Sequence, residues 1–256
     1  LALAIAALAA LPASASAGTV TTAVFKSEFA SAPSAAGGCG KTSSGFSCGL
    51  YSGAKLTLTG LVYASDGFTP LPAGWKLRLG AYDLRTGKRT AWVKSLTLDG
   101  TRVSYQLVIV PRLSTGYELS AFAPTASLGG HGKPVVAHVL ARILPQSKVF
   151  QRGSTFTLKG RVAFISGFGG GTLQLQACRR QHSTTYCSDK KRFTDSHWGS
   201  PLYAKRFAKA GRFATSVKLG SAGVWYYRFR FLPKNGRNAT SIYWFYITVT
   251  VGRGRH

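Results

Sequence analysis

Acidic side chains are scarce in this chain, whose 256 residues contain 7 Asp and Glu against 33 Lys and Arg. Glycoside hydrolysis by acid–base catalysis needs two facing carboxylates, and no candidate pair is present. Asp66, Asp83 and Asp99 fall in predicted turns, where Asp bonds its own backbone. The five His residues are scattered without metal-ligand spacing. We therefore predict a protein that is not an enzyme and has no metal site and no cofactor.

Two short segments imitate catalytic motifs without their structural context. Residues 35–42 resemble a relaxed phosphate-binding loop, but neither the preceding strand nor the following helix is present. Residues 45–49 fit the G-x-S-x-G pattern of a nucleophile elbow, yet no helix follows them. We interpret both as chance matches in a Gly/Ser-rich loop, which excludes a nucleotide cofactor and a serine hydrolase.

Long apolar runs are absent except at the start of the chain. Residues 1–11 are apolar, and Ala15-Ser16-Ala17 follows them, which is typical of a secretory signal peptide and its cleavage site. The alternative is a membrane anchor, but the run is short for a bilayer span. We therefore predict a signal peptide over residues 1–17 and a secreted, extracellular protein, with cell-wall association as a further option.

Cysteine is limited to four residues, and none of them forms a C-x-x-C motif. Cys39 with Cys48, and Cys178 with Cys187, each enclose eight residues. Zinc sites usually have closer spacing, whereas an even cysteine number in a secreted chain favours disulfides. We predict the local bridges Cys39–Cys48 and Cys178–Cys187, with the other two connectivities left open.

Helical periodicity is also missing after residue 18, while apolar and polar residues alternate as in half-buried strands. Residues 53–62 and 153–162 match position for position, which indicates one strand-rich module used twice. The predicted fold class is all-β, with two tandem β-sandwiches. The predicted organisation is a leader at 18–49 with a first strand at 19–25, sandwiches at 50–145 and 146–251 joined by a short linker at 145–148, and a basic tail at 252–256.

The two repeats share further features beyond this stretch. The pattern G-x-x-(L/F)-T-L-x-G-x-V is followed in each by a glycine turn and a closing strand, and residues 225–231 alternate aromatics with Arg. This combination resembles the immunoglobulin-like (fibronectin type III-like) repeats of secreted proteins from Gram-positive bacteria. The resemblance implies a spacer, adhesion or wall-associated module without shared catalytic residues, and the leader departs from it.

Positive charge is concentrated in the second unit. Residues 18–145 hold 13 basic and 5 acidic residues, a net charge of +8, and residues 146–256 hold 20 and 2, a net charge of +18. Such a charge attracts polyanions, although it also serves solubility alone. The predicted anion-binding residues are Arg179, Arg180, Lys190, Lys191, Arg192, Lys205, Arg206, Arg228 and Arg230.

Interleaved aromatic side chains give a second interpretation. Trp198, Tyr226 and Trp244 would stack on sugars if they were exposed. The first hypothesis is a non-catalytic surface protein that binds an anionic cell-wall polymer or polysaccharide, with nucleic acid only as a non-specific polyanion. The alternative is a carbohydrate- or protein-binding module that uses these aromatics. The sequon at Asn238 we interpret as a chance match.

Overall fold

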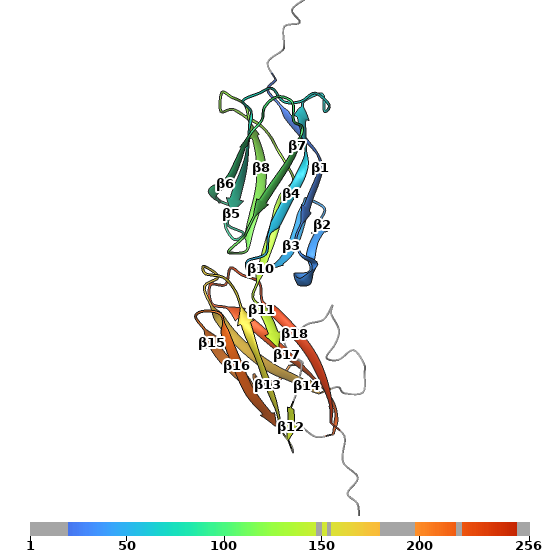
Figure 1. Cartoon of the computed structure of the whole chain (residues 1–256), viewed down its shortest axis with the longest axis vertical. Coiled ribbons are helices and arrows are strands. Elements are labelled where there is room, and N and C mark those ends of the chain that lie inside the picture. Colours follow the sequence, from blue (N-terminus) through green and yellow to red (C-terminus); the bar gives the residue numbers. More distant parts are fainter. Residues whose placement is uncertain (1–19, 147–149, 153–154, 180–197, 219–221, 250–256) are drawn as a thin grey trace, which may run out of the picture.

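The computed structural model describes residues 20–146, 150–152, 155–179, 198–218 and 222–249. It is all-β, as predicted, and its strands form two stacked lobes, each built from two sheets (Figure 1). We call residues 20–140 the N-lobe and residues 142–249 the C-lobe. No helix among the described residues is long and apolar enough to cross a membrane.

The N-lobe contains a three-stranded and a seven-stranded sheet. The first has the order β1 (Ala23–Ser31), β4 (Leu56–Ala64), β7 (Ser104–Ile109). The second has the order β2 (Gly38–Lys41), β3 (Phe46–Tyr51), β10 (Val135–Leu140), β8 (Thr115–Phe122), β5 (Lys76–Tyr82), β6 (Arg89–Thr97), with β9 (Leu128–His131) beside β8. A short 3-10 helix, η1 (Ser34–Ala36), precedes β2.

The C-lobe repeats this plan with two four-stranded sheets. One contains β13 (Thr155–Ala163) between β16 (Gly211–Lys218) on one side and β11 (Arg142–Pro145) and β12 (Phe150–Arg152) on the other. The other has the order β15 (Tyr203–Phe207), β14 (Gly171–Arg179), β17 (Gly223–Pro233), β18 (Ser241–Val249). Because β11 and β12 together occupy the place that β1 has beside β4, the two lobes have equivalent edges.

The duplicated stretch forms the central strand of one sheet in each lobe. Leu56, Leu58 and Val62 in β4 are buried, as are their counterparts in β13, and the residues between them point outward, as the alternation predicts. In β17 the buried aromatics are Tyr227, Phe229 and Phe231.

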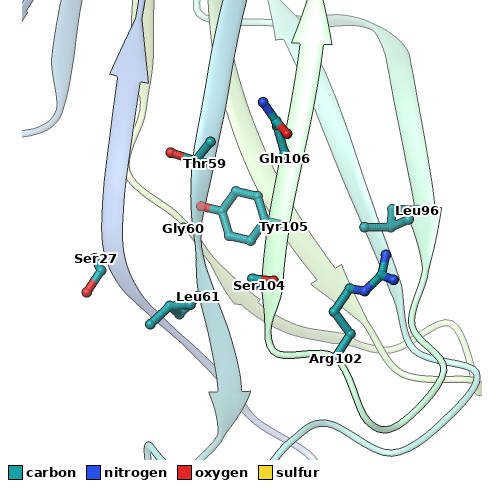
Figure 2. Close-up of a pocket in the computed structure, with 9 residues that line it drawn as sticks. All are labelled: Ser27, Thr59, Gly60, Leu61, Leu96, Arg102, Ser104, Tyr105 and Gln106. Atoms are coloured by element: carbon teal, nitrogen blue, oxygen red, sulfur yellow. The ribbon is translucent and has the colours of Figure 1, made fainter.

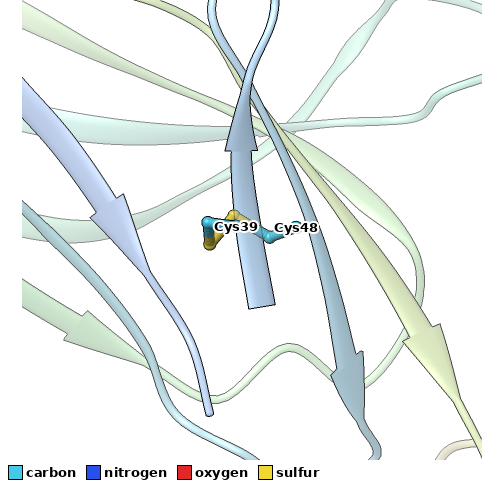
Figure 3. Close-up of a disulfide and its surroundings, with 2 residues drawn as sticks. All are labelled: Cys39 and Cys48. Carbon is cyan, nitrogen blue, oxygen red and sulfur yellow. A yellow bond between two sulfur atoms is a disulfide. The ribbon is translucent and has the colours of Figure 1, made fainter. Parts of the chain in front are cut away.

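The leader is part of the N-lobe rather than a separate segment. Strand β1 pairs with β4 along most of its length, and β3 runs parallel to β10. Residues 30–40 contain the end of β1, the 3-10 helix η1 and the start of β2. Cys39 and Cys48 face each other across β2 and β3 with Cα atoms 4.0 Å apart, and their predicted disulfide is present (Figure 3). The disulfide therefore links the paired strands β2 and β3 covalently.

The chain crosses between the lobes at a single buried residue, Ala141. A linker was expected at residues 145–148. Instead, β10 ends at Leu140 and β11 begins at Arg142, pairing with β13 of the C-lobe. The alternation of apolar and polar residues continues through Ile143, so the sequence pattern does not indicate that the pairing changes from one lobe to the other.

Asn238 forms hydrogen bonds that link the two lobes at this crossover. Its Oδ1 accepts a hydrogen bond from the Ser114 N–H (2.8 Å), and its Nδ2 donates to the Phe168 carbonyl (3.0 Å). Nearby, Ser52 Oγ accepts a hydrogen bond from the Ile165 N–H (3.1 Å). Asn238 is 8% exposed and both ends of its amide are engaged, so the folded chain has no room for a glycan there. This agrees with reading the sequon as chance.

Candidate anion-binding site

A cationic hollow lies on the C-lobe where β13 and β16 pair. Lys159 and Arg161 alternate with the buried Leu158 and Val162, so both point out of the sandwich. Arg212 of β16 is directly opposite Arg161, which places two guanidinium-bearing residues side by side. Together with Lys205 they line a hollow of about 690 Å³. We call Lys159, Arg161, Lys205 and Arg212 the basic hollow.

The floor of the basic hollow is an aromatic ring beside a glycine. Phe213 pairs with Gly160, and a Cβ at Gly160 would lie 2.6 Å from both the Phe213 Cζ and the Leu144 carbonyl oxygen. Lys205 is positioned above this floor, because its Nζ donates to the Arg212 carbonyl at 3.1 Å and lies 5.4 Å from the centre of the Phe207 ring. These two contacts fix the position of the Lys205 ammonium group.

No carboxylate neutralises the basic hollow within the described residues. The two acidic residues beyond residue 145, Asp189 and Asp195, lie outside the described ranges, so the described C-lobe carries no acidic side chain. The one ion pair described for a C-lobe cation joins Arg237 to Asp83 of the N-lobe, at 3.9 Å. Exposed cations without counter-charges repel one another, and they bind an external anion without first breaking an ion pair.

The N-lobe has an equivalent hollow of about 850 Å³, lined by Thr59, Gly60, Leu61, Ser104, Tyr105 and Gln106 together with Ser27, Leu96 and Arg102 (Figure 2). The strand registers match: Gly60 pairs with Tyr105 as Gly160 pairs with Phe213, and Leu61 pairs with Ser104 as Arg161 pairs with Arg212. Among its described lining residues, Arg102 is the single cation. We call this the neutral hollow.

A carboxylate accompanies the neutral hollow. Glu28 accepts hydrogen bonds from the Lys133 N–H at 2.9 and 3.0 Å, and the Tyr105 hydroxyl lies 3.4 Å from its Oε1. Burial raises the pKa of Glu28 above its ordinary value, although these hydrogen bonds lower it. Burial, aided by Glu28, also raises the pKa of Tyr105. Phe213 has no hydroxyl, so the C-lobe has no equivalent of this pair.

The structure separates the basic residues that the sequence grouped together. Lys205 lines the basic hollow, but Arg206, its neighbour in β15, points to the other face of its sheet and pairs across from Thr172. Arg230 of β17 belongs to that other face as well, opposite Gln174. Lys159, Arg161 and Arg212 were not among the predicted site residues, although the exchange of Thr59 and Leu61 for Lys159 and Arg161 between the repeats was a signal.

Arg228 is not available to an external anion, contrary to the prediction. It is 1% exposed; its Nε donates to the Gln176 Oε1 (2.9 Å), and its guanidinium lies 4.4 Å from the centre of the Trp198 ring. Trp198 is itself 7% exposed and packs with Cys178, so its expected role as an exposed stacking residue is also wrong. The segment that begins at Trp198 covers this face, which strand alternation alone does not reveal.

The remaining predicted residues stay outside what the structure describes. Arg180, Lys190, Lys191, Arg192 and Cys187 lie in residues 180–197, and the side chains of Arg179 and Trp244 are also outside the description. Cys178 is disulfide-bonded, and Cys187 is its predicted partner. The signal peptide and the basic tail fall outside the described ranges too.

Carboxylates elsewhere serve turns. Asp66, Asp83 and Asp99 each accept two backbone N–H bonds within their own turn, as predicted. Backbone bonds lower the pKa of Asp83, and that of Asp99 to about 2, while a hydrogen bond from the Thr69 side chain together with the backbone bonds lowers the pKa of Asp66. Within the described residues no group of three or more His, Cys, Asp or Glu side chains is arranged to hold a metal ion.

Comparisons with known proteins give structural likeness only. No protein-family model matches the chain, and no curated protein matches it. A two-domain fibronectin type III segment of chicken tenascin is 9% identical, with 74% of this chain and 91% of that chain covered and a TM-score of 0.37. The FN1–FN3 domains of chicken CNTN1 are 12% identical, with 78% and 65% covered and a TM-score of 0.26.

A carbohydrate-binding candidate from Bacteroides uniformis is also similar, at 14% identity, with 71% of this chain and 90% of that chain covered and a TM-score of 0.28. At such low scores and identities these likenesses say nothing about the ligand of this chain.

Proposed function

We propose that this chain is a non-catalytic extracellular binding protein whose C-lobe holds an anionic polymer in the basic hollow. The observation that carries the proposal is the difference between two equivalent hollows. At matched strand positions Thr59, Leu61 and Ser104 are replaced by Lys159, Arg161 and Arg212. Solubility alone requires no particular location for charge, whereas these three cations line one hollow to which no described residue contributes a carboxylate.

The extracellular location rests on two features of the chain. Residues 1–17 have the pattern of a signal peptide, and the Cys39–Cys48 disulfide is typical of an oxidising compartment. We propose further that the lobes are two tandem immunoglobulin-like domains that act as a wall-associated or spacer module, in line with the resemblance to repeats of secreted Gram-positive proteins. The alternative, in which exposed aromatic side chains stack on sugars, is weakened because Trp198 is buried.

The test compares one triple variant with a matched control on the full mature chain. Lys159→Thr, Arg161→Leu and Arg212→Ser convert the basic hollow to its N-lobe counterpart. Lys41→Gln, Lys55→Gln and Arg102→Gln remove the same charge from exposed N-lobe sites. Both are titrated against an anionic wall polymer, a uronate polysaccharide and single-stranded DNA over a salt series, with circular dichroism to verify folding.

We expect the hollow variant to lose most of its affinity for polyanions. If three contacts to a single-stranded polyanion are lost, the log–log dependence of affinity on salt falls by about 2. The control should keep the slope nearly unchanged. Equal losses in the two variants would show that net charge alone drives binding, and no binding by the unaltered chain at low salt would refute the proposal.

A further inference from the structure

The outer face of the N-lobe sheet carries a second cationic feature, formed by arginines and aromatic rings on β5, β6 and β8. The Arg89 Cζ lies 4.1 Å from the centre of the Trp92 ring, and the Arg78 Cζ lies 6.0 Å from the same ring. Arg78 is also 5.2 Å from the Phe122 ring, which meets Trp92 edge to face at 5.5 Å. Both guanidinium groups are therefore held against rings.

A glycine and a bulge determine the position of Trp92. Trp92 pairs with Gly80, and a Cβ at Gly80 would lie 3.2 Å from the Arg89 Cδ and 3.3 Å from the Trp92 Cζ3. The register of β5 and β6 shifts between Leu79 and Gly80, so Val93 is left without a partner. The bulge lies on β6, the last strand of this sheet, and opens a hollow of about 370 Å³ lined by Arg78, Trp92, Val93, Lys94 and Ser95.

The neighbouring carboxylates are already engaged. Glu118, opposite Gly80 in β8, has its Oε1 2.5 Å from the His131 Nδ1, and the two form an ion pair when the imidazole is protonated. Asp83, which follows β5, accepts two backbone bonds of its own turn and pairs with Arg237. Within the described residues, neither Arg78 nor Arg89 has a carboxylate within 4.0 Å. No carboxylate among the described residues therefore neutralises these two arginines, whose positions are fixed by the aromatic rings.

We infer that this face is a binding site for an acidic saccharide, namely a uronate residue. A guanidinium stacked on a ring keeps its in-plane N–H donors, which match a planar carboxylate in two parallel bonds. The indole edge of Trp92 and the Val93 side chain give apolar contact for a pyranose ring, and the Ser95 hydroxyl suits a sugar hydroxyl. The site is separate from the basic hollow in residues and in lobe, so it does not depend on the function proposed there.

The test is titration of the full mature chain with oligogalacturonate, carried out in the triple hollow variant so that the C-lobe site does not contribute. Trp92→Leu leaves the net charge unchanged but removes the stacking ring. Arg78→Lys keeps the charge and removes the planar fork. Arg102→Gln is the control, because it removes an exposed positive charge from the same lobe at another hollow. Inorganic polyphosphate is the comparison ligand.

We expect Arg78→Lys to weaken oligogalacturonate binding by about tenfold, the loss typical of one charged hydrogen bond. Trp92→Leu should weaken it by about tenfold as well, because the ring that holds the guanidinium groups in place is lost. Arg102→Gln should change it by less than about twofold, as for an exposed charge. Polyphosphate binding depends on charge rather than on stacking, so Trp92→Leu, which keeps the net charge, should leave it nearly unchanged. The inference is wrong if Trp92→Leu, shown by circular dichroism to be folded, binds oligogalacturonate as tightly as the parent chain. It is also wrong if Arg78→Lys changes the affinity no more than the Arg102→Gln control does. If Trp92→Leu does not fold, the result for Arg78→Lys alone tests the inference.

Discussion

The two hollows occupy the same place in the two lobes and differ in what surrounds them. Each has a glycine on its central strand and an aromatic ring opposite: Gly60 with Tyr105, and Gly160 with Phe213. In the N-lobe the ring carries a hydroxyl beside Glu28, and the lining is mostly neutral. In the C-lobe the ring is apolar and four cations line the surface. The scaffold is shared, and only the side chains around it change the electrostatic field.

The shared floor also has a physical reason. A glycine in a strand interior leaves a gap and costs backbone entropy, and a cross-strand aromatic ring that covers it restores apolar contact. Since both lobes keep the pair, its role lies in the fold. The charges, which differ between lobes, are then the candidates for function.

The largest expected effect comes from filling this floor. A Cβ at Gly160 would meet a backbone oxygen as well as the Phe213 ring, both at 2.6 Å, whereas the three atoms nearest to a Cβ at Gly60 all belong to the Tyr105 side chain. A side chain gives way more readily than backbone, so Gly160→Ala should reduce the free energy of unfolding by about 3 kcal/mol and Gly60→Ala by about 1 kcal/mol. Urea denaturation of both variants measures this. Equal losses would mean that the two floors are not packed as described.

A smaller effect is expected from moving the charge into the N-lobe. Thr59→Lys, Leu61→Arg and Ser104→Arg give the neutral hollow the cations of its counterpart. We expect a gain of about tenfold in affinity for a polyanion at low salt, which corresponds to about 1.4 kcal/mol. The gain should vanish at higher salt because exposed charges are screened. The measurement is titration in the background of the triple C-lobe variant; an unchanged affinity would place the specificity outside these positions.

The smallest effect concerns Glu28, a carboxylate beside the neutral hollow that has no counterpart among the described residues of the C-lobe. Its pKa is raised in the folded state, so the folded chain binds this proton more readily than the unfolded chain. The stability it contributes is therefore full below its ordinary pKa and is lost as the pH rises through the raised value. Glu28→Gln should increase stability near pH 7 by less than about 1 kcal/mol, because solvent screens a half-exposed group. Thermal melts of both proteins from pH 3 to pH 7, roughly the range around an ordinary Glu pKa, measure the effect. A mutant that loses stability as steeply as the parent chain over that range would contradict it.

Prediction from sequence succeeded where a single strand decides the outcome. Alternation placed Leu56, Leu58 and Val62 inside, and the spacing of Cys39 and Cys48 indicated their disulfide. Prediction from the sequence failed where a segment distant in the chain determines the burial or the pairing of a residue. Arg228 has the outward position that alternation assigns, yet Trp198 and Gln176 bury it. The lobe crossover at Ala141 was missed for the same reason, because β11 changes its pairing partner without changing its pattern.

What the sequence determined by itself is the all-β class, the duplication and the excess of positive charge in the second repeat, because each is written in composition or in a period of two. The tertiary structure decided which charges act together. Residues of β13 and β16 lie some fifty positions apart, and their antiparallel register alone brings Arg161 opposite Arg212. The separate register of β15 on β14 places Arg206 on the opposite face of the other sheet, and burial removes Arg228 from the surface. Strand pairing is a non-local interaction, so the local pattern that creates each strand cannot specify its neighbour.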